Sequence, residues 1–344
     1  FDVSNSIFEI KEYWTLPTNI KDYDEDELIE KLAIEFDDVI KRHMIADVPV
    51  SSFLSGGLDS SMISVAASKI NKNISTYTIG TSIEDKKIES MPDDEKYAKH
   101  VADLNNFDHN EIIINSDITN MLPQMVKTLD EPIGDPAAIN TFLICKAARE
   151  KGVKVLLSGM GADEIFCGYR RQKALLFSQK YKKLPSFIKV LTKSIVNLLP
   201  VKIGSRGLRL SRWSKKFISF AEMPDEQAYR TSYSYYEKNE LEKLLKHNSE
   251  SEIDSIYKDH RLLFNKNYHG DVVNQMCFTD INMFMNGLNL TYTDRSSMAA
   301  SVEVRVPFID KKFISFVMSI PGKYKYKNRQ SKYILKKTAE SILP

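Results

Sequence analysis

Residues 48–61, VPVSSFLSGGLDSS, decide the fold that the sequence predicts. The first seven of them, 48–54, form a short apolar run rich in valine, which favours a buried strand. They run directly into 55-SGGLDSS-61, and the apolar residues that follow have helical spacing up to Ile70. A strand that delivers two glycines to a helix start exposes backbone N–H groups at the positive end of the helix dipole. This arrangement is typical of a phosphate-binding loop, although an ordinary turn with serine caps is the alternative.

The same alternation of strands and helices extends through the first half of the chain. Further strands are expected at 74–80, 111–115 and 153–158, and helices after the N-cap Asp24, at 94–104 and at 138–150. Such alternation predicts an α/β fold with a mostly parallel sheet covered on both faces. Beyond Tyr169 no strand is expected, and helices are predicted at 186–199 and 226–246. We therefore divide the chain into an irregular lead-in at 1–23, an α/β core at about 24–170 and a mostly helical region at about 171–344.

Composition excludes several classes of protein. Apolar residues make up 42% of the chain and charged residues 27%, which is ordinary for a globular protein. The three cysteines, Cys145, Cys167 and Cys277, are far apart, which argues against a zinc knuckle or a disulfide framework and fits a reducing compartment such as the cytoplasm. No apolar run is long enough to span a bilayer, and no signal peptide is apparent. Because the sequence begins at Phe1 and not at methionine, we expect it to be part of a longer polypeptide.

A second glycine loop, 158-SGMGADEIFCGYRR-171, follows the strand expected at 153–158. In a parallel sheet, loops at the carboxyl ends of strands converge on one crevice. Asp59 in the first loop would repel a phosphate unless a cation stood between them, and Mg²⁺ would resolve that conflict. Asp163 in the second loop could share the ion. Two unrelated polar turns are the less favoured interpretation.

Two further segments carry clustered charges. The segment 294-DRSSMAASVEVRVPFID-310 alone indicates a helix followed by a turn, with salt bridges as the simplest explanation of its charges. The segment 329-RQSKYILKKTAESILP-344 begins with basic residues and continues as an amphipathic helix. Basic residues in such a place usually form a solvated face.

Together the four segments resemble the synthetase domain of the glutamine-hydrolysing asparagine synthetases, a family related to the β-lactam synthetases. The resemblance runs from about Trp14 to Pro344 and rests on S-G-G-L-D-S, S-G-x-G-x-D-E-x-F-x-G-Y and D-R-x-S-M-A-x-S-V-E-x-R-x-P-F-x-D. It implies the α/β fold of the PP-loop ATP pyrophosphatases, also called adenine nucleotide alpha hydrolase-like. It also implies a carbon–nitrogen ligase in which ATP adenylates a small-molecule carboxylate, pyrophosphate leaves, and ammonia displaces AMP.

The resemblance also assigns roles to individual residues. Asp59 and Asp163 match ligands of Mg²⁺, and Lys332 matches a lysine that neutralises the leaving pyrophosphate. Arg295 and Arg305 either assist it or form salt bridges. The positions that match contacts to ATP are Leu54, Ser55, Gly56, Gly57, Asp59, Ser60, Ile79, Ser158 and Gly159.

Three departures from the family bear on the reaction. The ammonia is expected from a glutaminase domain that is not part of this chain, and 13-YWTLP-17 resembles the linker that follows that domain. Met160 stands where the best-known asparagine synthetases have a glutamate thought to assist the chemistry, and methionine cannot transfer a proton. Pro136, Ala137 and Ala138 lie near the place of an arginine suited to gripping aspartate.

These departures leave the acceptor open. The β-carboxylate of aspartate, giving asparagine, is the default. The alternatives are another carboxylate, such as a sugar acid in surface-polysaccharide assembly, an intramolecular amide closure as in β-lactam synthetases, and a nucleotide-binding module without catalysis. The intact D-E-x-F-x-G-Y run disfavours the closure.

Charge is unevenly placed along the chain. Residues 165–221 contain 14 Lys and Arg but no Asp or Glu, although the net charge of the whole chain is only +2. A helical extension with solvated lysines is the simpler interpretation, and weak attachment to an anionic membrane surface is the sharper one. No known nucleic-acid motif accompanies the charge, so nucleic acid is not expected as a partner. The oligomeric state is left open, with a homodimer as one option.

Overall fold

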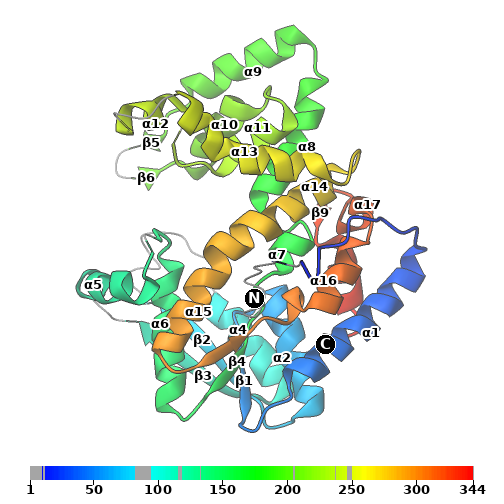
Figure 1. Cartoon of the computed structure of the whole chain (residues 1–344), viewed down its shortest axis with the longest axis vertical. Helices are drawn as coiled ribbons and strands as arrows, with labels where there is room; N and C mark the ends of the chain where they lie inside the picture. The colour runs from blue at the N-terminus through cyan, green and yellow to red at the C-terminus, as the bar shows by residue number, and fades with distance from the viewer. Residues whose placement is uncertain are drawn as a thin grey trace, which may run out of the picture.

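The computed structural model of the chain describes residues 10, 12–81, 94–114, 118–131, 133–203, 206–236, 238–245 and 250–343. A five-stranded sheet lies at the lower end of the molecule as drawn in Figure 1, and every pair of neighbouring strands in it is parallel. In spatial order its strands are β3 (Asp108–Ile114), β2 (Ser75–Thr81), β1 (Val50–Phe53), β4 (Val155–Leu157) and β7 (Glu303–Arg305). The sheet confirms the predicted fold class.

Helices account for most of the rest of the described chain. The helices of the first half are α1 (Glu25–His43), α2 (Leu58–Ile70), α4 (Asp94–Asn105), α5 (Ile118–Leu129), α6 (Ala137–Glu150) and α7 (Ala162–Ile165). Those of the second half are α8 (Arg170–Lys182), α9 (Ser186–Leu198), α10 (Arg209–Phe220), α11 (Asp225–Tyr233), α12 (Lys238–Leu244), α13 (Glu250–Lys266), α14 (Val272–Thr279), α15 (Leu290–Ala299), α16 (Lys311–Met318), α17 (Gly322–Lys325) and α18 (Tyr333–Ala339). The smaller elements are the π-helix η1 (Asp280–Asn289), the 3₁₀ turn η2 (Pro307–Ile309) and the strand pairs β5 (Lys202–Ile203) with β6 (Arg206–Gly207) and β8 (Tyr326–Lys327) with β9 (Gln330–Ser331).

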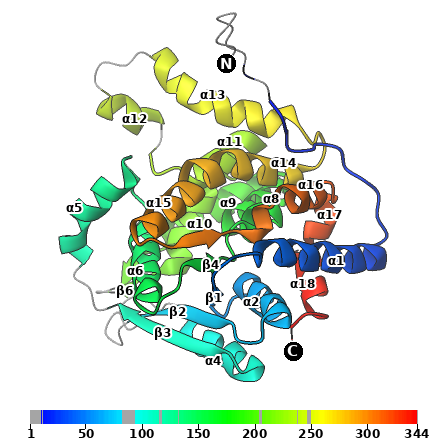
Figure 2. The same ribbon diagram turned by 60° about the horizontal axis from the view of Figure 1, so that its bottom comes forward.

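The sheet separates two apolar cores. Successive side chains of a strand point to opposite faces, so Val155 and Leu157 of β4 lie in one core while Leu156 lies in the other. Helices α1 and α2 contribute to the first core, and α5, α6 and α15 contribute to the second (Figure 2). Because both faces are covered, β4 consists only of apolar residues, as the sequence pattern required.

Helices α8 to α13 form a helical lobe at the upper end of the molecule (Figure 1). From this lobe α14, η1 and α15 return toward the sheet in direct succession, from Val272 to Ala299. Residues 12–23 have no regular structure, while 1–9 and 11 lie outside the described residues. No helix in the described ranges has both the length and the apolar content needed to cross a membrane.

The structure corrects two of the predicted elements. No strand was expected beyond Tyr169, but β5, β6, β7, β8 and β9 all lie there, each with only two or three residues. In β7 two of the three residues, Glu303 and Arg305, are charged, as is common at the edge of a sheet. The helix expected at 226–246 is two helices, because the backbone turns extended at Ser234 and α11 ends there. The strands expected at 48–54, 74–80, 111–115 and 153–158, the helix at 186–199 and the N-cap Asp24 are confirmed, apart from small differences at the ends and Asn115, which lies outside the described residues.

Asp310 joins α1 to the last part of the chain. Its carboxylate accepts hydrogen bonds from the backbone N–H groups of Lys312 and Phe313, which caps α16, and from the Arg42 guanidinium of α1 at 2.7 Å. Burial alone would raise the pKa of Asp310, but Arg42 and the two N–H groups lower it below its usual value. The ionised carboxylate is therefore stabilised by the folded state.

We predict that Asp310→Asn destabilises the chain most above about pH 4, the range in which an unfolded aspartate is ionised. Because the pKa of Asp310 is lowered by folding, this stabilisation is complete above the unfolded pKa and is lost as the pH falls through the folded pKa. Chemical denaturation at several pH values measures the effect. Asp38→Asn, which removes an exposed partner of Lys41, is the control and should change the unfolding free energy little at any pH. If the loss of unfolding free energy caused by Asp310→Asn did not become smaller at low pH, the lowered pKa of Asp310 in the folded chain would be contradicted.

Candidate functional site

The loop between β1 and α2 is closed by its own serines. The Ser60 hydroxyl accepts a hydrogen bond from the backbone N–H of Ser55 at 3.1 Å and lies 3.0 Å from the Ser55 hydroxyl. Gly56 has a φ of +71°, and a Cβ there would overlap Tyr97 and Ala98 of α4. Glycine is therefore required at Gly56 on two grounds, conformation and space.

The loop between β4 and α7 lies directly against the first loop. A Cβ on Gly159 would be 2.9 Å from the backbone nitrogen of Ser60 and 3.2 Å from Cβ of Asp59, so only glycine fits there. Gly161 has a φ of +95° and turns the chain into α7. The two glycine loops therefore meet at the carboxyl ends of β1 and β4, as the sequence predicted.

Lys332 links the two loops through their carboxylates. Its Nζ lies 2.6 Å from Oδ2 of Asp59 and 2.7 Å from Oδ1 of Asp163. Lys332 precedes α18 with a left-handed backbone (φ of +53°), and its N–H donates to the carbonyl of Phe166. Burial alone would lower the pKa of Lys332, but the two carboxylates raise it above its usual value. The lysine is therefore held in its charged form.

The residues present fit a divalent cation between the loops. Oδ1 of Asp59 is buried and accepts no hydrogen bond, so one oxygen of this carboxylate is left for another partner. Burial raises the pKa of Asp59 in spite of Lys332, so additional positive charge would stabilise its ionised form. No group of three or more His, Cys, Asp or Glu ligands occurs among the residues that the structure describes. Two carboxylates suit Mg²⁺, which keeps several waters and binds phosphate oxygens.

A cavity of about 620 Å³ opens between the loops and the π-helix. Ten of the residues discussed individually in the sequence analysis line it: Ser55, Gly57, Asp59, Ser60, Ile79, Ala137, Ser158, Gly159, Met160 and Asp163. Leu54 is instead fully buried, with its N–H bonded to the carbonyl of Tyr77, and Gly56 packs on α4. Lys332 does not line the cavity itself, but its two ion-pair partners, Asp59 and Asp163, do.

Arg295 and Arg305 do not line this cavity. Arg295 forms an ion pair with Asp130. Arg305 pairs with Glu303 and donates to the backbone carbonyls of His43 and Ile45, both at 2.7 Å. Their contacts match the salt-bridge alternative and give no support to a part in catalysis.

Several polar residues of the cavity carried no role in the sequence analysis. Glu164 is buried, which raises its pKa to about 7, and its Oε1 accepts hydrogen bonds from Tyr169 Oη at 2.5 Å and Asn289 Nδ2 at 2.7 Å. The D-E-x-F-x-G-Y run, whose E and Y are Glu164 and Tyr169, was the available signal, but no role had been assigned to either residue. Asn289 ends the π-helix η1, which has no sequence pattern of its own. The other lining residues of this kind are Asp135, Asn140, Thr141, Tyr292 and Thr293.

Met160 faces the cavity and also packs. Its sulfur accepts a weak hydrogen bond from the Thr293 hydroxyl at 3.5 Å, and its side chain packs against the core that holds Leu156 and Tyr292. The thioether thus fills space at the position where the family resemblance leads one to expect a carboxylate.

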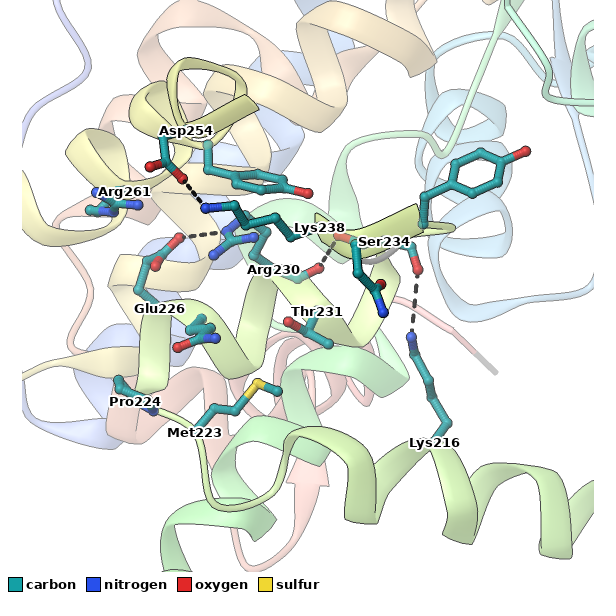
Figure 3. A pocket seen from close by; sticks show the side chains of 14 residues that line it. Lys216, Met223, Pro224, Glu226, Arg230, Thr231, Ser234, Lys238, Asp254 and Arg261 are labelled. Carbon is teal, nitrogen blue, oxygen red and sulfur yellow. Dashed lines mark hydrogen bonds and ion pairs between the residues drawn. The ribbon is translucent and has the colours of Figure 1, made fainter. Parts of the chain in front are cut away.

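A second cavity, of about 570 Å³, lies in the helical lobe (Figure 3). Lys238 pairs with Asp254 at 3.2 Å, and Arg230 pairs with Glu226 at 3.0 Å. Four of its lining charges are engaged in these two ion pairs, and no residue of either glycine loop lines it. The candidate site is therefore the cavity at the glycine loops.

The family model that matches this chain and three of its relatives are named as asparagine synthases or synthetases. The family model described as Asparagine synthase matches residues 31–344. Asparagine synthetase [glutamine-hydrolyzing] 1 of Bacillus subtilis is 32% identical over 322 residues, which cover 93% of this chain and 48% of the relative. A putative asparagine synthetase [glutamine-hydrolyzing] of Mycobacterium tuberculosis is 29% identical, covering 92% and 46%. Asparagine synthetase [glutamine-hydrolyzing] 3 of Bacillus subtilis is 28% identical, covering 96% and 49%. The chain spans about half the length of these relatives.

We predict that Gly168→Ala disrupts the site while leaving the fold intact. A Cβ at Gly168 would overlap Oδ1 of Asp163 and Cε of Lys332, so the ion pairs between them must separate. The affinity for MgATP, measured by calorimetry, should fall at least about tenfold, the effect of losing roughly one charge-assisted hydrogen bond. Gly287→Ala is the matched control, because nothing lies within 4 Å of a Cβ there. Unchanged MgATP affinity in Gly168→Ala would show that nucleotide binding does not depend on this ion-pair geometry.

Proposed function

The chain belongs to the asparagine synthase family, and we propose that it forms an amide from a carboxylate using ATP. The observation that carries the proposal is the pair of glycine loops joined through Lys332, Asp59 and Asp163. In this proposal the loop at 55–60 binds the pyrophosphate part of ATP. Backbone at Leu54 and Ile79 contacts the adenosine part, and Ser158 and Gly159 make another contact with the nucleotide.

The proposed reaction has two steps. An oxygen of the substrate carboxylate attacks the α-phosphorus of ATP, and the bond to the oxygen between the α- and β-phosphates breaks. Negative charge then builds on the leaving pyrophosphate, and the Lys332 ammonium stabilises it. Asp59 and Asp163 would hold Mg²⁺, which when bound supplies further charge neutralisation on phosphate oxygens. In the second step ammonia attacks the activated carbonyl carbon, AMP leaves with its electron pair, and the nitrogen releases one proton to water to give the neutral amide.

Ammonia needs a source, and we propose a glutamine-hydrolysing domain. The relatives are named as glutamine-hydrolysing enzymes, and the chain spans about half their length. We assign the reaction to the cytoplasm, since the three cysteines are buried and unpaired.

The acceptor carboxylate is the part of the proposal with two candidates. Aspartate is the default for the family. A different carboxylate is the second candidate, because none of the described residues that line the cavity is Lys or Arg, while Asp135 and Glu164 both line it. An acceptor with a second free carboxylate finds no cationic lining partner there. A module without catalysis is disfavoured by the assembled Lys332, Asp59 and Asp163 group.

Pyrophosphate release from ATP and Mg²⁺ with ammonium present tests the function across a panel of carboxylates. Release with aspartate supports the default acceptor, and release with another carboxylate alone supports the second candidate. Absence of release across a broad panel would contradict the proposed function.

We predict that Lys332→Ala lowers the rate of pyrophosphate release by about 10²–10³-fold, the usual effect of removing one preorganised charge-stabilising group. Lys337→Ala is the matched control, because Lys337 lies on the same helix but pairs with Glu340 at the surface. Asp59→Asn provides a second variant in case Lys332→Ala unfolds, and it should raise the Mg²⁺ concentration needed for half-maximal rate. Full turnover in both site variants would rule out the assigned roles.

Met160→Leu should keep the rate of pyrophosphate release and of amide formation within about twofold, because leucine has a similar volume and equally lacks a transferable proton. Both products are measured on the same samples. A loss of amide formation with pyrophosphate release retained would instead show that the thioether takes part in the second step.

A further inference from the structure

Helix α9 in the helical lobe presents an apolar face that the described chain does not cover. No residue of this 13-residue helix is buried. Its apolar stripe, at helical spacing, consists of Phe187, Val190, Leu191, Ile195 and Leu198, with exposed fractions from 53% at Ile195 to 84% at Leu198. Single exposed apolar residues are normal, but five on one helix face indicate an interaction surface.

The opposite side of α9 holds it to the lobe. Ile188 and Val196 on that side are partly buried. The backbone carbonyl of Lys189 accepts a hydrogen bond from the Tyr181 hydroxyl. The side-chain ammonium of Lys189 lies 3.5 Å from Oε1 of Glu222. The apolar stripe is therefore a fixed outer face of a packed helix.

Positive charge surrounds this face. Lys183 precedes α9, Lys193 lies in it and Lys202 follows it, and all three are exposed. They belong to residues 165–221, in which 14 Lys and Arg occur without one acidic residue. An apolar stripe bordered by lysines is the pattern of a helix that lies in the surface of an anionic membrane.

The position of α9 suits such a contact. It lies at the upper end of the molecule in Figure 1, at the opposite end of the long axis from the sheet, and no element is drawn beyond it. A flat surface could therefore approach α9 along the long axis.

We infer that α9 docks the chain on the surface of an anionic lipid bilayer, with Phe187, Leu191 and Leu198 entering the interface and the lysines facing lipid headgroups. A second copy of the chain is a poorer occupant, because a two-fold contact would set this basic segment against itself. The inference does not depend on the proposed reaction.

Co-sedimentation with vesicles tests the inference. The chain should bind vesicles containing phosphatidylglycerol at low salt, and it should bind phosphatidylcholine vesicles far less. Phe187→Ser with Leu191→Ser should weaken binding at least about tenfold, since each side chain loses its burial in the interface. Lys193→Gln with Lys202→Gln should weaken it about fivefold for each charge removed.

Leu122→Ser with Val126→Ser is the matched control, because it removes two exposed apolar side chains from another helix, α5. This control should bind vesicles as the unchanged chain does, and thermal unfolding confirms that every variant is folded. Three results would overturn the inference: no binding to anionic vesicles, equal binding to neutral ones, or full binding by the α9 variant. Sedimentation velocity adds a fourth, a dimer that the α9 substitutions dissociate, since the stripe would then belong to a second copy.

Discussion

The ion pairs of Lys332 with Asp59 and Asp163 are the constraint around which the site is built. Two carboxylates brought to one place repel each other unless positive charge lies between them. The lysine can supply that charge because its backbone is left-handed and because Gly168 leaves room for its side chain. Three segments far apart in the sequence are thereby fixed relative to one another. Asp59 and Asp163 line the cavity, so a change at Lys332 acts on the two carboxylates that face it as well as on the charge proposed for catalysis.

The sequence alone was sufficient for those parts of the fold and site that depend on local pattern. Strand β4 could be predicted because it is a short apolar run, and β1 because it lies in the valine-rich run 48–54; both lead into glycine loops. The meeting of their loops followed from the geometry of parallel sheets, without knowledge of any contact. The pairing of Asp59 with Asp163 could thus be predicted, whereas Lys332 came from family resemblance alone.

The parts that could not be predicted depend on contacts between distant residues. Glu164, Tyr169 and Asn289 form one hydrogen-bonded group, but Asn289 is 125 residues from Glu164 and ends a π-helix. The sequence does not indicate which acceptors Arg305 uses. In the folded chain its guanidinium donates to the backbone carbonyls of His43 and Ile45, about 260 residues away. The spacing of residues in the sequence does not indicate these hydrogen-bond partners, because they are determined by how the helices pack.

The edge strand β7 has a consequence for how the chain is made. Strands β1 to β4 all lie before residue 158, but β7 pairs with β4 only after Arg305 has been synthesised. On a ribosome, the nascent sheet therefore exposes the unpaired backbone of β4 while roughly another 145 residues are added, several seconds at usual elongation rates. An open apolar strand edge is a template for aggregation. From this order of strands we expect the chain to need protection against aggregation during its synthesis more than the finished fold does.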